Sequence, residues 1–548
     1  MTVRDDPAEP AYRRGLALIT ALVVLTGVLW AVLAPPFRAP DEPQHVNSVL
    51  RLAYGGGWPS AGEALVGPAV DAAREQAALD TDLPGRHYDR VDVPPFIAVP
   101  PVPDDDRPVV DAGNALADPL PPGTSTRHLP KTAVDQMTQH PPLYYAVAAL
   151  VLRGTGLAEA RWDHQLLALR LFDVALLLPV PLLAAAAARR LSGSRPAALV
   201  AASFTLFVPQ AGHIMGSVTN DALVTLSGAV ITYLCVVVLG GDLRARTAVW
   251  LGIALGVGLL TKVMVVFALP MVVAAYLVAP GPRARRLRGT LLAGAVALVA
   301  GGWWWLRNLL VLGTVQPVGI PDRFADGEPA GLWHFLRTGV TQVTRSFFGN
   351  FGWLELRIPD GFFWTASVTI GALAAIALVR LAAARRAVGV LLLLPAALWL
   401  AVLVNAWPGY QETGLIIAVQ GRYLFAGLAA LSVTTALGAA ALLGPRICRA
   451  VPWLVGAACV AAASGLAYGF WGFYQGSTST VAEAAARWAG WSPLTGPQLA
   501  VLVSVLVLAA VAAVLACGLF ARSTALAETT AAPQARAATR AAGTGSSA

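Results

Sequence analysis

Long apolar runs separated by short arginine-rich segments constrain this chain more than any other feature. A transmembrane helix needs about 20 mostly apolar residues, and about twelve stretches approach or reach that length. The 56% hydrophobic and 13% charged residues fit this pattern, because about a quarter of a soluble protein is charged. We therefore predict an all-α polytopic membrane protein with about twelve transmembrane helices. The expected spans are 15–34, 166–188, 196–212, 222–240, 247–261, 263–279, 289–306, 362–379, 387–405, 423–444, 451–472 and 498–519.

Arginines gather in the short segments between these runs and predict the orientation of the chain. Short loops rich in Lys and Arg remain on the cytoplasmic side of a membrane. The run 141–152 is apolar but too short to span, and counting it as a span would place the later arginine-rich loops outside. We therefore expect a short interfacial or re-entrant helix there, a retained first helix and both termini in the cytoplasm. The basic loops are 188–195, 241–246, 280–289, 380–386 and 445–449.

This orientation divides the chain into a few regions. We expect 1–14 to be a cytoplasmic N-terminus and 15–520 to be one transmembrane domain. Within that domain, 35–165 forms a large extracytoplasmic loop after the first helix, and 308–361 forms a second one. The Ala/Thr/Ser-rich tail 521–548 is expected to be cytoplasmic and disordered. The formal net charge of +8 follows from the basic loops, so we expect no binding to nucleic acid.

Unusual polar residues lie mostly at the predicted outer ends of the spans. The stretch APPFRAPDEPQHVNSV places an Asp-Glu pair and a His directly after the first span, among prolines. HPPLYY closes the first loop, and further acids and cations stand at later helix ends. Ionisable residues at membrane depth are costly, so each one is a candidate for function. The candidates are Asp41, Glu42, His45, His140, Tyr144, Asp221, Lys262, Arg307 and Arg422.

Each candidate also has a structural interpretation. Asp41 and Glu42 suit the N-cap and first turn of a helix, where acids interact favourably with the helix dipole. Arg307 and Arg422 are able to snorkel toward the membrane interface. The two histidines lack the spacing of metal ligands, so a structural role is open to both. Lys262 is harder to explain in this way, because a lysine between two apolar runs requires a polar partner or water.

Another acid and cation lie inside the second span rather than at its end. Arg170 and Asp173 are three positions apart, which places them on one face of a helix. We therefore expect Arg170 and Asp173 to pair with each other and to be structural.

Acids and cations from six segments converge on the same predicted membrane face. This combination suits a reaction in which Arg or Lys holds an anionic leaving group while a carboxylate accepts a proton. A lipid-linked phosphate arriving from the bilayer would meet these side chains at that depth. Acidic oxygens also bind Mg²⁺ or Mn²⁺. The sequence does not identify a cofactor with certainty, and it leaves open whether Mg²⁺ or Mn²⁺ is used. The candidate metal ligands are Asp41 and Asp221.

An ordered set of motifs resembles a known superfamily. FRAPDEPQHVNSVLRLAYGGGWP comes first, HPPLYY follows the long loop, and TNDA, TK, WWWLRN, FFGNFGW and QGRYLF come later in that order. Each motif alone is weakly specific. The ordered set, over about residues 15–475, resembles the GT-C glycosyltransferase superfamily, and most closely its branch of predicted bacterial membrane proteins with a domain of unknown function.

The resemblance implies an activity and a location. GT-C enzymes pass a sugar from a polyprenyl-phosphate donor to an acceptor hydroxyl at the outer face of the membrane, usually with inversion. For this chain it implies a multi-pass glycosyltransferase of a bacterial cell membrane, with a cell-envelope glycan or glycoprotein as acceptor. One inverting displacement needs a carboxylate near the acceptor oxygen and cations near the departing phosphate.

Roles of individual residues follow from the same resemblance. Asp41 matches the general base, and Glu42 its neighbour or a substrate ligand. Asp221 matches the second acidic position of the superfamily. HPPLYY resembles a juxtamembrane helix that borders the donor groove, although His140 stands where some relatives have Lys. The remaining substrate-binding candidates are Arg422, Lys262, Arg307, Tyr144 and His45.

Three other functions remain open from the sequence. About twelve spans also suit a transporter or lipid flippase, although the polar residues of many transporters lie near the midplane rather than at one face. A polysaccharide polymerase or ligase would use an external Arg- and His-rich loop, for which His140 and Arg345 are candidates. A GT-C scaffold that binds lipid-linked sugar without catalysis is the third, and the intact Asp41-Glu42 pair argues against it.

Overall fold

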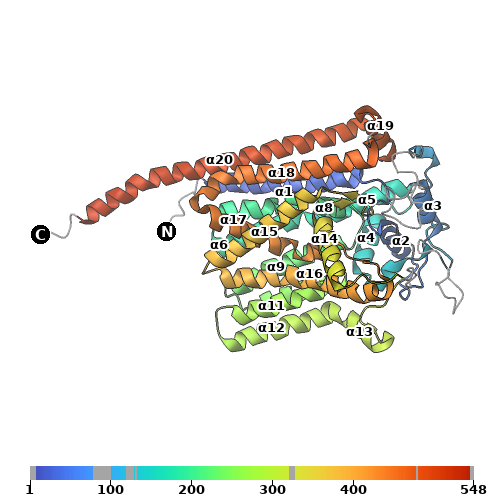
Figure 1. The fold of residues 1–548 in the computed structure, drawn as a ribbon, viewed down its shortest axis with the longest axis horizontal. Helices are drawn as coiled ribbons and strands as arrows, with labels where there is room; N and C mark the ends of the chain where they lie inside the picture. Colours follow the sequence, from blue (N-terminus) through green and yellow to red (C-terminus); the bar gives the residue numbers. More distant parts are fainter. Residues whose placement is uncertain are drawn as a thin grey trace.

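Helices that run side by side form most of this computed structural model. It describes residues 8–77, 100–118, 129, 133–319, 327–476 and 479–543, with side chains up to residue 525. Figure 1 shows the long helices aligned as one bundle. We call the two ends of the bundle the loop end and the arginine end. The loop end is where four shorter helices gather, α2 (Glu42–Ala53), α3 (Pro68–Gln76), α4 (Leu143–Gly154) and α19 (Val481–Trp491).

Apolar segments form helices here because backbone groups inside a membrane must be hydrogen-bonded within the segment. The elements of the first half of the bundle are α1 (Ala8–Leu33), α5 (Trp162–Leu177), α6 (Pro179–Ser192), α7 (Arg195–Ser203), η6 (Phe204–Phe207), α8 (Pro209–Met215), α9 (Asp221–Leu239), α10 (Ala245–Leu259), η7 (Val263–Ala268) and α11 (Leu269–Val278). Those of the second half are α12 (Arg283–Ala297), η8 (Leu298–Gly302), α13 (Trp303–Leu312), α15 (Asp360–Arg380), α16 (Arg385–Thr413), η9 (Gly421–Gly427), α17 (Leu428–Leu443), η10 (Gly444–Arg446), α18 (Ile447–Phe470), η11 (Trp471–Gln475) and α20 (Gly496–Gly543).

The number of membrane passes agrees with the hydropathy pattern. Within the described residues, eight helices are long and apolar enough to cross a membrane, or nine if the bent pair Arg195–Phe207 and Pro209–Met215 is one span. The stretch Gly421–Gln475 counts once among them but contains two long helices, α17 and α18, which the turn η10 joins. Counting α17 and α18 separately raises the nine candidate spans to ten. Two shorter apolar helices, Ala245–Leu259 and Val263–Val278, raise the number to twelve. The predicted all-α polytopic fold is confirmed.

The loop end contains structure that hydropathy did not reveal. The second predicted outer segment, 308–361, holds the amphipathic helix α14 (Leu332–Phe348), followed by the antiparallel strands β1 (Asn350–Phe351) and β2 (Leu356–Arg357). In the first segment, α4 covers the short apolar run and lies beside α2. Two 3-10 turns, η2 (Asp104–Asp106) and η5 (Gln136–Gln139), complete the described elements there.

The arginine end brings the basic loops together. An open cavity of about 570 Å³ is lined by Arg190, Arg244 and Arg285, one from each of three successive basic loops. Glu9 of α1 also pairs with Arg189 and Arg195, at 3.1 and 3.0 Å between nitrogen and oxygen. The loops that the sequence assigns to one membrane face therefore lie at one end of the bundle.

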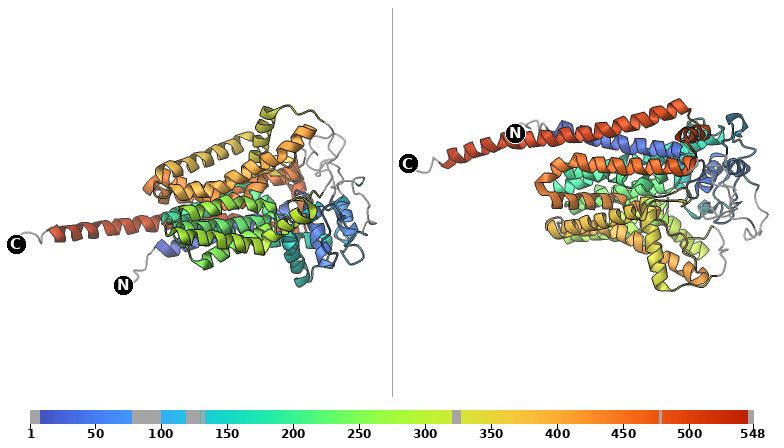
Figure 2. Two further views of the ribbon diagram at one scale, coloured as in Figure 1. Left: turned by 90° about the horizontal axis from the view of Figure 1, so that it is seen from below. Right: turned by 45° about the horizontal axis from the view of Figure 1, so that its top comes forward.

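The cytoplasmic, disordered tail expected at 521–548 stays a prediction, and the structure describes its backbone up to Gly543. The last helix, α20, continues to Gly543 and extends beyond the bundle (Figures 1 and 2). The tail is rich in alanine, the residue with the highest helix propensity, so continuing the helix costs little. Its low hydrophobicity, which suggested disorder, does not oppose helix formation.

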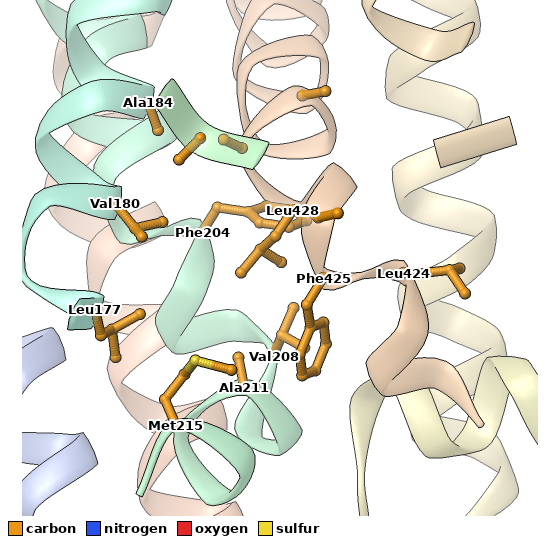
Figure 3. Close-up of a cluster of buried hydrophobic side chains, with 14 of the residues drawn as sticks. Leu177, Val180, Ala184, Phe204, Val208, Ala211, Met215, Leu424, Phe425 and Leu428 are labelled. Carbon is orange, nitrogen blue, oxygen red and sulfur yellow. The ribbon is translucent and has the colours of Figure 1, made fainter. Parts of the chain in front are cut away.

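A buried apolar cluster lies beside the bend between η6 and α8. Figure 3 shows Phe425 beside Val208, and Leu428 beside Phe204. Phe425 and Leu428 follow Arg422 closely in the QGRYLF motif and its continuation, so this packing fixes the height of that arginine. The chain bends by 68° between Arg195–Phe207 and Pro209–Met215.

Candidate functional site

Asp41 occupies the N-cap position of α2 without capping it. Its backbone is left-handed, with φ 63° and ψ 11°, and its side chain makes no capping hydrogen bond. The carboxylate instead accepts a hydrogen bond from Gln136 Nε2 at Oδ1, at 2.9 Å, and pairs with Arg422 Nη2 at Oδ2. An aspartate at this position normally accepts from the backbone of its own helix. Strained residues of this kind concentrate at functional sites, so the local structural interpretation does not account for Asp41.

Arg422 contacts Asp41 although it lies 381 positions later in the sequence. It stands on η9, where the Gly421 N–H donates to Ser346 Oγ at 2.8 Å. A Cβ at Gly421 would clash with the backbone of Phe347, so a glycine is required there. The guanidinium donates from Nη1 to the carbonyl oxygen of Pro40 at 3.2 Å. This contact holds the arginine against the turn that presents Asp41.

Lys262 supplies a second cation from the break between α10 and η7. Its Nζ lies 2.6 Å from Asp221 Oδ1 and 3.3 Å from Asn220 Oδ1. The other Asp221 oxygen, Oδ2, is 3.7 Å from Arg422 Nε. Tyr423 lies beneath both cations, with Lys262 Nζ 5.0 Å and the Arg422 guanidinium carbon 5.3 Å from its ring centre. Lys262 therefore has the polar partners that its position in the sequence demanded.

Asp41, Arg422, Asp221 and Lys262 form a continuous chain of alternating charges, which we call the ion quartet. The side chain of Asp41 is 22% exposed, whereas those of the other three are 8% or less. The quartet thus opens to its surroundings at Asp41. Two of its buried atoms, Asp221 Oδ2 and Arg422 Nε, make no hydrogen bond among the described residues. They are able to contact a bound group without first breaking a hydrogen bond.

Two histidines and a tyrosine line the quartet. His45 Nδ1 lies 3.0 Å from Tyr145 Oη, and this hydroxyl also accepts from Asn220 Nδ2 at 3.3 Å. Burial, and then the charge of Lys262, lower the pKa of His140 to about 3 and that of His45 well below its ordinary value. Both imidazoles are therefore neutral at pH 7. The buried Nδ1 of His140 makes no hydrogen bond in the part of the chain described.

Glu42 lies next to Asp41 but belongs to a separate contact. Arg170 holds it with two hydrogen bonds of 2.7 Å, and Val218 N donates to it at 3.0 Å. Arg170 also donates to the carbonyl oxygens of Ala31, Ala34 and Pro35 at the end of α1. Both side chains are almost fully buried. Glu42 and Arg170 thus fasten the turn that carries Asp41 to α1 and α5.

The predicted pairing of Arg170 with Asp173 is wrong. Asp173 instead accepts from Tyr144 Oη, at 2.9 Å to each oxygen, and from Thr219 N at 2.7 Å. Helical spacing places the two side chains on one face, but partners from α2 and α4 reach each of them first. Tyr144, predicted to bind substrate, donates to this buried carboxylate.

Arg307 does not join the quartet. It is exposed on α13, where Nη1 lies 3.2 Å from Asn308 Oδ1 and the guanidinium stands 5.7 Å from the ring centre of Trp304. No contact with the four charges is recorded for it among the residues described. The α13 helix carries it along the outside of the bundle, as Figure 1 shows.

Asp135 and Gln136 are site residues that the sequence analysis missed. Asp135 is buried and accepts from Asn47 Nδ2 at 2.7 Å and from Ser48 Oγ at 2.8 Å, both on α2. Burial raises its pKa. This anchor places the neighbouring Gln136 where it donates to Asp41. The pair stands only a few positions before HPPLYY, so that motif was the available signal.

The donor set does not fit a divalent cation. Each carboxylate of the quartet is paired with Arg422 or Lys262, so a metal bound between Asp41 and Asp221 would stand beside two positive charges. Mg²⁺ and Mn²⁺ prefer several oxygen ligands. Among the described residues, no group of three or more His, Cys, Asp or Glu side chains is arranged to hold a metal ion. The charge balance favours an anion beside the two cations.

Comparison with known proteins identifies a family and a few structures. The family model described as "Predicted membrane protein (DUF2142)" matches residues 24–432, which include all four quartet residues. No curated protein matches the chain. ArnT from Cupriavidus metallidurans, in a crystal structure bound to undecaprenyl phosphate, is 14% identical, with a TM-score of 0.46 over 94% of this chain and 79% of ArnT. The apo oligosaccharyltransferase of Archaeoglobus fulgidus is 10% identical, with a TM-score of 0.38 over 92% and 56% of the respective chains.

Proposed function

This chain belongs to the DUF2142 family of predicted membrane proteins, and we propose that it is an integral membrane glycosyltransferase. In this proposal it moves a sugar from a polyprenyl-phosphate donor to a hydroxyl of a cell-envelope glycan or glycoprotein. The ion quartet carries the proposal, because it places one partly exposed carboxylate at the edge of two buried cations. The GT-C resemblance of the ordered motifs supports the same reaction class.

Asp41 is the proposed general base. The acceptor oxygen attacks the anomeric carbon, its proton passes to the Asp41 carboxylate, and the bond from the anomeric carbon to the phosphate oxygen breaks. The bonding electrons leave with the polyprenyl phosphate, so atoms and charge balance in one displacement. A positioned carboxylate contributes about 10²–10⁴-fold to such a proton transfer. A single displacement inverts the anomeric centre and requires no carboxylate nucleophile.

Arg422 and Lys262 are the proposed partners of the departing phosphate. Arginine is always charged and presents a planar fork that matches phosphate oxygens, while lysine acts as a compact point charge. In the structure Asp41 and Asp221 hold both cations in place. A phosphate bound there would share them with the carboxylates, and the low exposure of the cations would strengthen the attraction. The neutral His140 adds a hydrogen-bonding group without adding charge.

Glu42 positions Asp41 in this proposal and does not contact substrate. Its two oxygens are held by Arg170 and Val218 N inside the protein. Tyr144 is likewise occupied by Asp173, and His45 by Tyr145. These residues form a rigid frame that holds the quartet in one geometry, as an effective catalytic site requires.

We further propose that the site faces outward from the plasma membrane of a bacterium. The arginine end would then lie in the cytoplasm, in keeping with the positive-inside rule. The donor and acceptor would meet at the loop end, beside α2 and α4. We also propose that the reaction uses no divalent cation, because Arg422 and Lys262 already provide the positive charge that a metal would supply.

The test measures release of free polyprenyl phosphate by the full chain in lipid bilayers. A panel of polyprenyl-phosphate sugars is supplied with a cell-envelope extract as acceptor, with and without EDTA. We expect release by the wild type in both conditions and a loss of at least about 100-fold for Asp41→Asn. Asp105→Asn, at an exposed aspartate of the loop end, is the matched control.

Either of two results would overturn this function. A folded Asp41→Asn variant with wild-type turnover would remove Asp41 as the base. Movement of the intact donor across the bilayer, without any release of polyprenyl phosphate, would favour a flippase. A loss of release with EDTA alone would reject only the metal-free part of the proposal.

A further inference from the structure

A groove lies between α18 and α20 near the arginine end of the bundle. Its volume is about 360 Å³. The two helices lie side by side at the edge of the bundle (Figures 1 and 2). Most of the α20 segment faces away from the protein, since only 11% of its apolar window is buried. The groove therefore opens toward the lipid. Its walls include Arg449, Trp453, Val514, Gly518, Ala521 and Arg522.

The groove is charged at one level and apolar elsewhere. Arg449 stands in the first turn of α18, and Arg522 follows the start of α20 at Gly496 by 26 residues, or about 39 Å of helix. That length exceeds the hydrocarbon thickness of about 30 Å, so Arg522 reaches the polar interface of the membrane. The residue Trp453 is 80% exposed, and exposed tryptophans concentrate at that level.

Neither arginine of the groove has an acidic partner among the described side chains. Both are exposed, although they come from different helices and line the same cavity. Elsewhere at this end, Arg189 and Arg195 pair with Glu9, and Arg244 pairs with Asp242. The groove thus combines an apolar channel with two exposed arginines that pair with no acid among the side chains described up to residue 525.

We propose that this groove binds one anionic glycerophospholipid, with its phosphate between Arg449 and Arg522. Guanidinium groups match phosphate oxygens well. An acyl chain would lie along the apolar wall formed by Val514 and Gly518. A soluble anion such as free phosphate would leave that wall unused, so the combination favours a lipid. This binding is independent of the proposed glycosyl transfer at the opposite end of the bundle.

The alternative is that the two arginines only satisfy the positive-inside rule. Arginines of that kind attract anionic lipids without selecting a site, and basic residues near the surface each contribute modestly. The two interpretations differ in stoichiometry and in which variants matter. A built site retains one lipid and depends on Arg449 and Arg522, whereas a general surface field depends equally on any basic residues at this end.

Native mass spectrometry of the full chain in detergent separates these interpretations. The probes are phosphatidylglycerol, phosphatidylcholine and inorganic phosphate, each titrated separately. We expect one tightly retained phosphatidylglycerol, with affinity about 30-fold lower in the Arg449→Ala/Arg522→Ala double variant. The matched control is Arg380→Ala/Arg386→Ala, which removes two exposed arginines of the same end outside the groove. Its affinity should equal that of the wild type.

A second variant tests the apolar wall without changing charge. A Cβ built at Gly518 meets no atom within 4 Å, so Gly518→Leu would fill the groove without a clash. We expect it to weaken phosphatidylglycerol retention about 10-fold or more while the fold is maintained, since leucine favours a helix over glycine. The proposal is overturned by equal binding of the two lipids, by equal losses in both double variants, or by unchanged retention in Gly518→Leu.

Discussion

The two ends of the bundle use the same charged residue types in opposite ways. At the loop end, Arg170 and Glu42 are 4% and 0% exposed, and each is held by several hydrogen bonds. At the arginine end, the side chain of Arg244 is 79% exposed while it pairs with Asp242. A buried charge that loses its partner is strongly destabilising, whereas an exposed pair contributes little. Burial therefore decides whether an ion pair builds a site or only orients the chain.

Removing the arginine of one ion pair at each end should give the largest difference in the free energy of unfolding. Arg170→Met leaves the Glu42 carboxylate buried without its cation, so we expect the free energy of unfolding to fall by about 3–5 kcal/mol. Arg244→Met should show no measurable change, because water replaces the lost contact. Unfolding in mixed micelles, followed by tryptophan fluorescence, measures both. Equal stability of the two variants would contradict the distinction between the ends.

The second test compares arginine-to-lysine variants at the two ends, which keep the positive charge but change the shape of the cation. Arg422→Lys keeps the positive charge beside Asp41 but loses the fork that contacts Pro40 and Asp41. We expect kcat/KM for the polyprenyl-phosphate donor to fall about 100-fold, with acceptor KM unchanged. Arg386→Lys at the arginine end is the control and should behave as wild type. A rise in acceptor KM alone would place Arg422 at the other substrate.

The pH dependence of stability should separate a buried histidine from an exposed one within the loop end. His140 titrates at its ordinary value near 6.5 in the unfolded chain and at about 3 in the folded protein. Between these values the unfolded state binds more protons, so stability falls as the pH falls. The loss of folding free energy that His140 causes approaches about 1.4 kcal/mol for each pH unit below 6.5.

His140→Gln should therefore flatten the fall in melting temperature between pH 7 and pH 5. His164→Gln, at an exposed histidine, is the matched control and should retain the wild-type slope. Thermal unfolding at pH 7, 6 and 5 measures all three proteins. Parallel slopes for the wild type and His140→Gln would show that the imidazole becomes charged in the folded state.

The smallest expected effect concerns a hydrogen bond. Gln136→Leu removes the donor to Asp41 Oδ1 and leaves the pair with Arg422 intact. We expect turnover to fall about 10-fold with little change in donor KM, because a hydrogen bond to a charged group contributes about 1.5 kcal/mol or more. Gln139→Leu, whose side chain accepts from Gly319 N instead, is the matched control. Unchanged turnover in Gln136→Leu would mean that Arg422 alone orients Asp41.

Hydropathy and arginine spacing predict the bundle well because each is a local property of the chain. The helix start at Asp221 and the break at Lys262 also follow from local polarity. The amphipathic helix α14 was missed because its polar face lowers the mean hydropathy of its window. For the tail, low hydrophobicity favours disorder whereas a high alanine content favours a helix, so composition alone does not decide between the two.

The pairing of charges is not a local property and could not be predicted. Spacing favoured Arg170 with Asp173, yet the partner of Arg170 lies 128 positions away. Asp41 was identified as a candidate, but its contacts with Gln136 and Arg422 depend on how distant segments pack. The sequence therefore predicts which residues belong to the site more readily than which residues pair with each other.

The separation of Asp41 from Arg422 has a consequence for biosynthesis. The two residues are 381 positions apart, so at about 5–20 residues per second Arg422 emerges roughly 20–80 seconds after Asp41. During that interval Asp41, Asp221 and Lys262 enter the membrane without the cation that joins them. A chain that stalls before residue 422 holds an incomplete set of charges at membrane depth. The quartet is therefore able to assemble only after the last of its four residues, Arg422, has been synthesised.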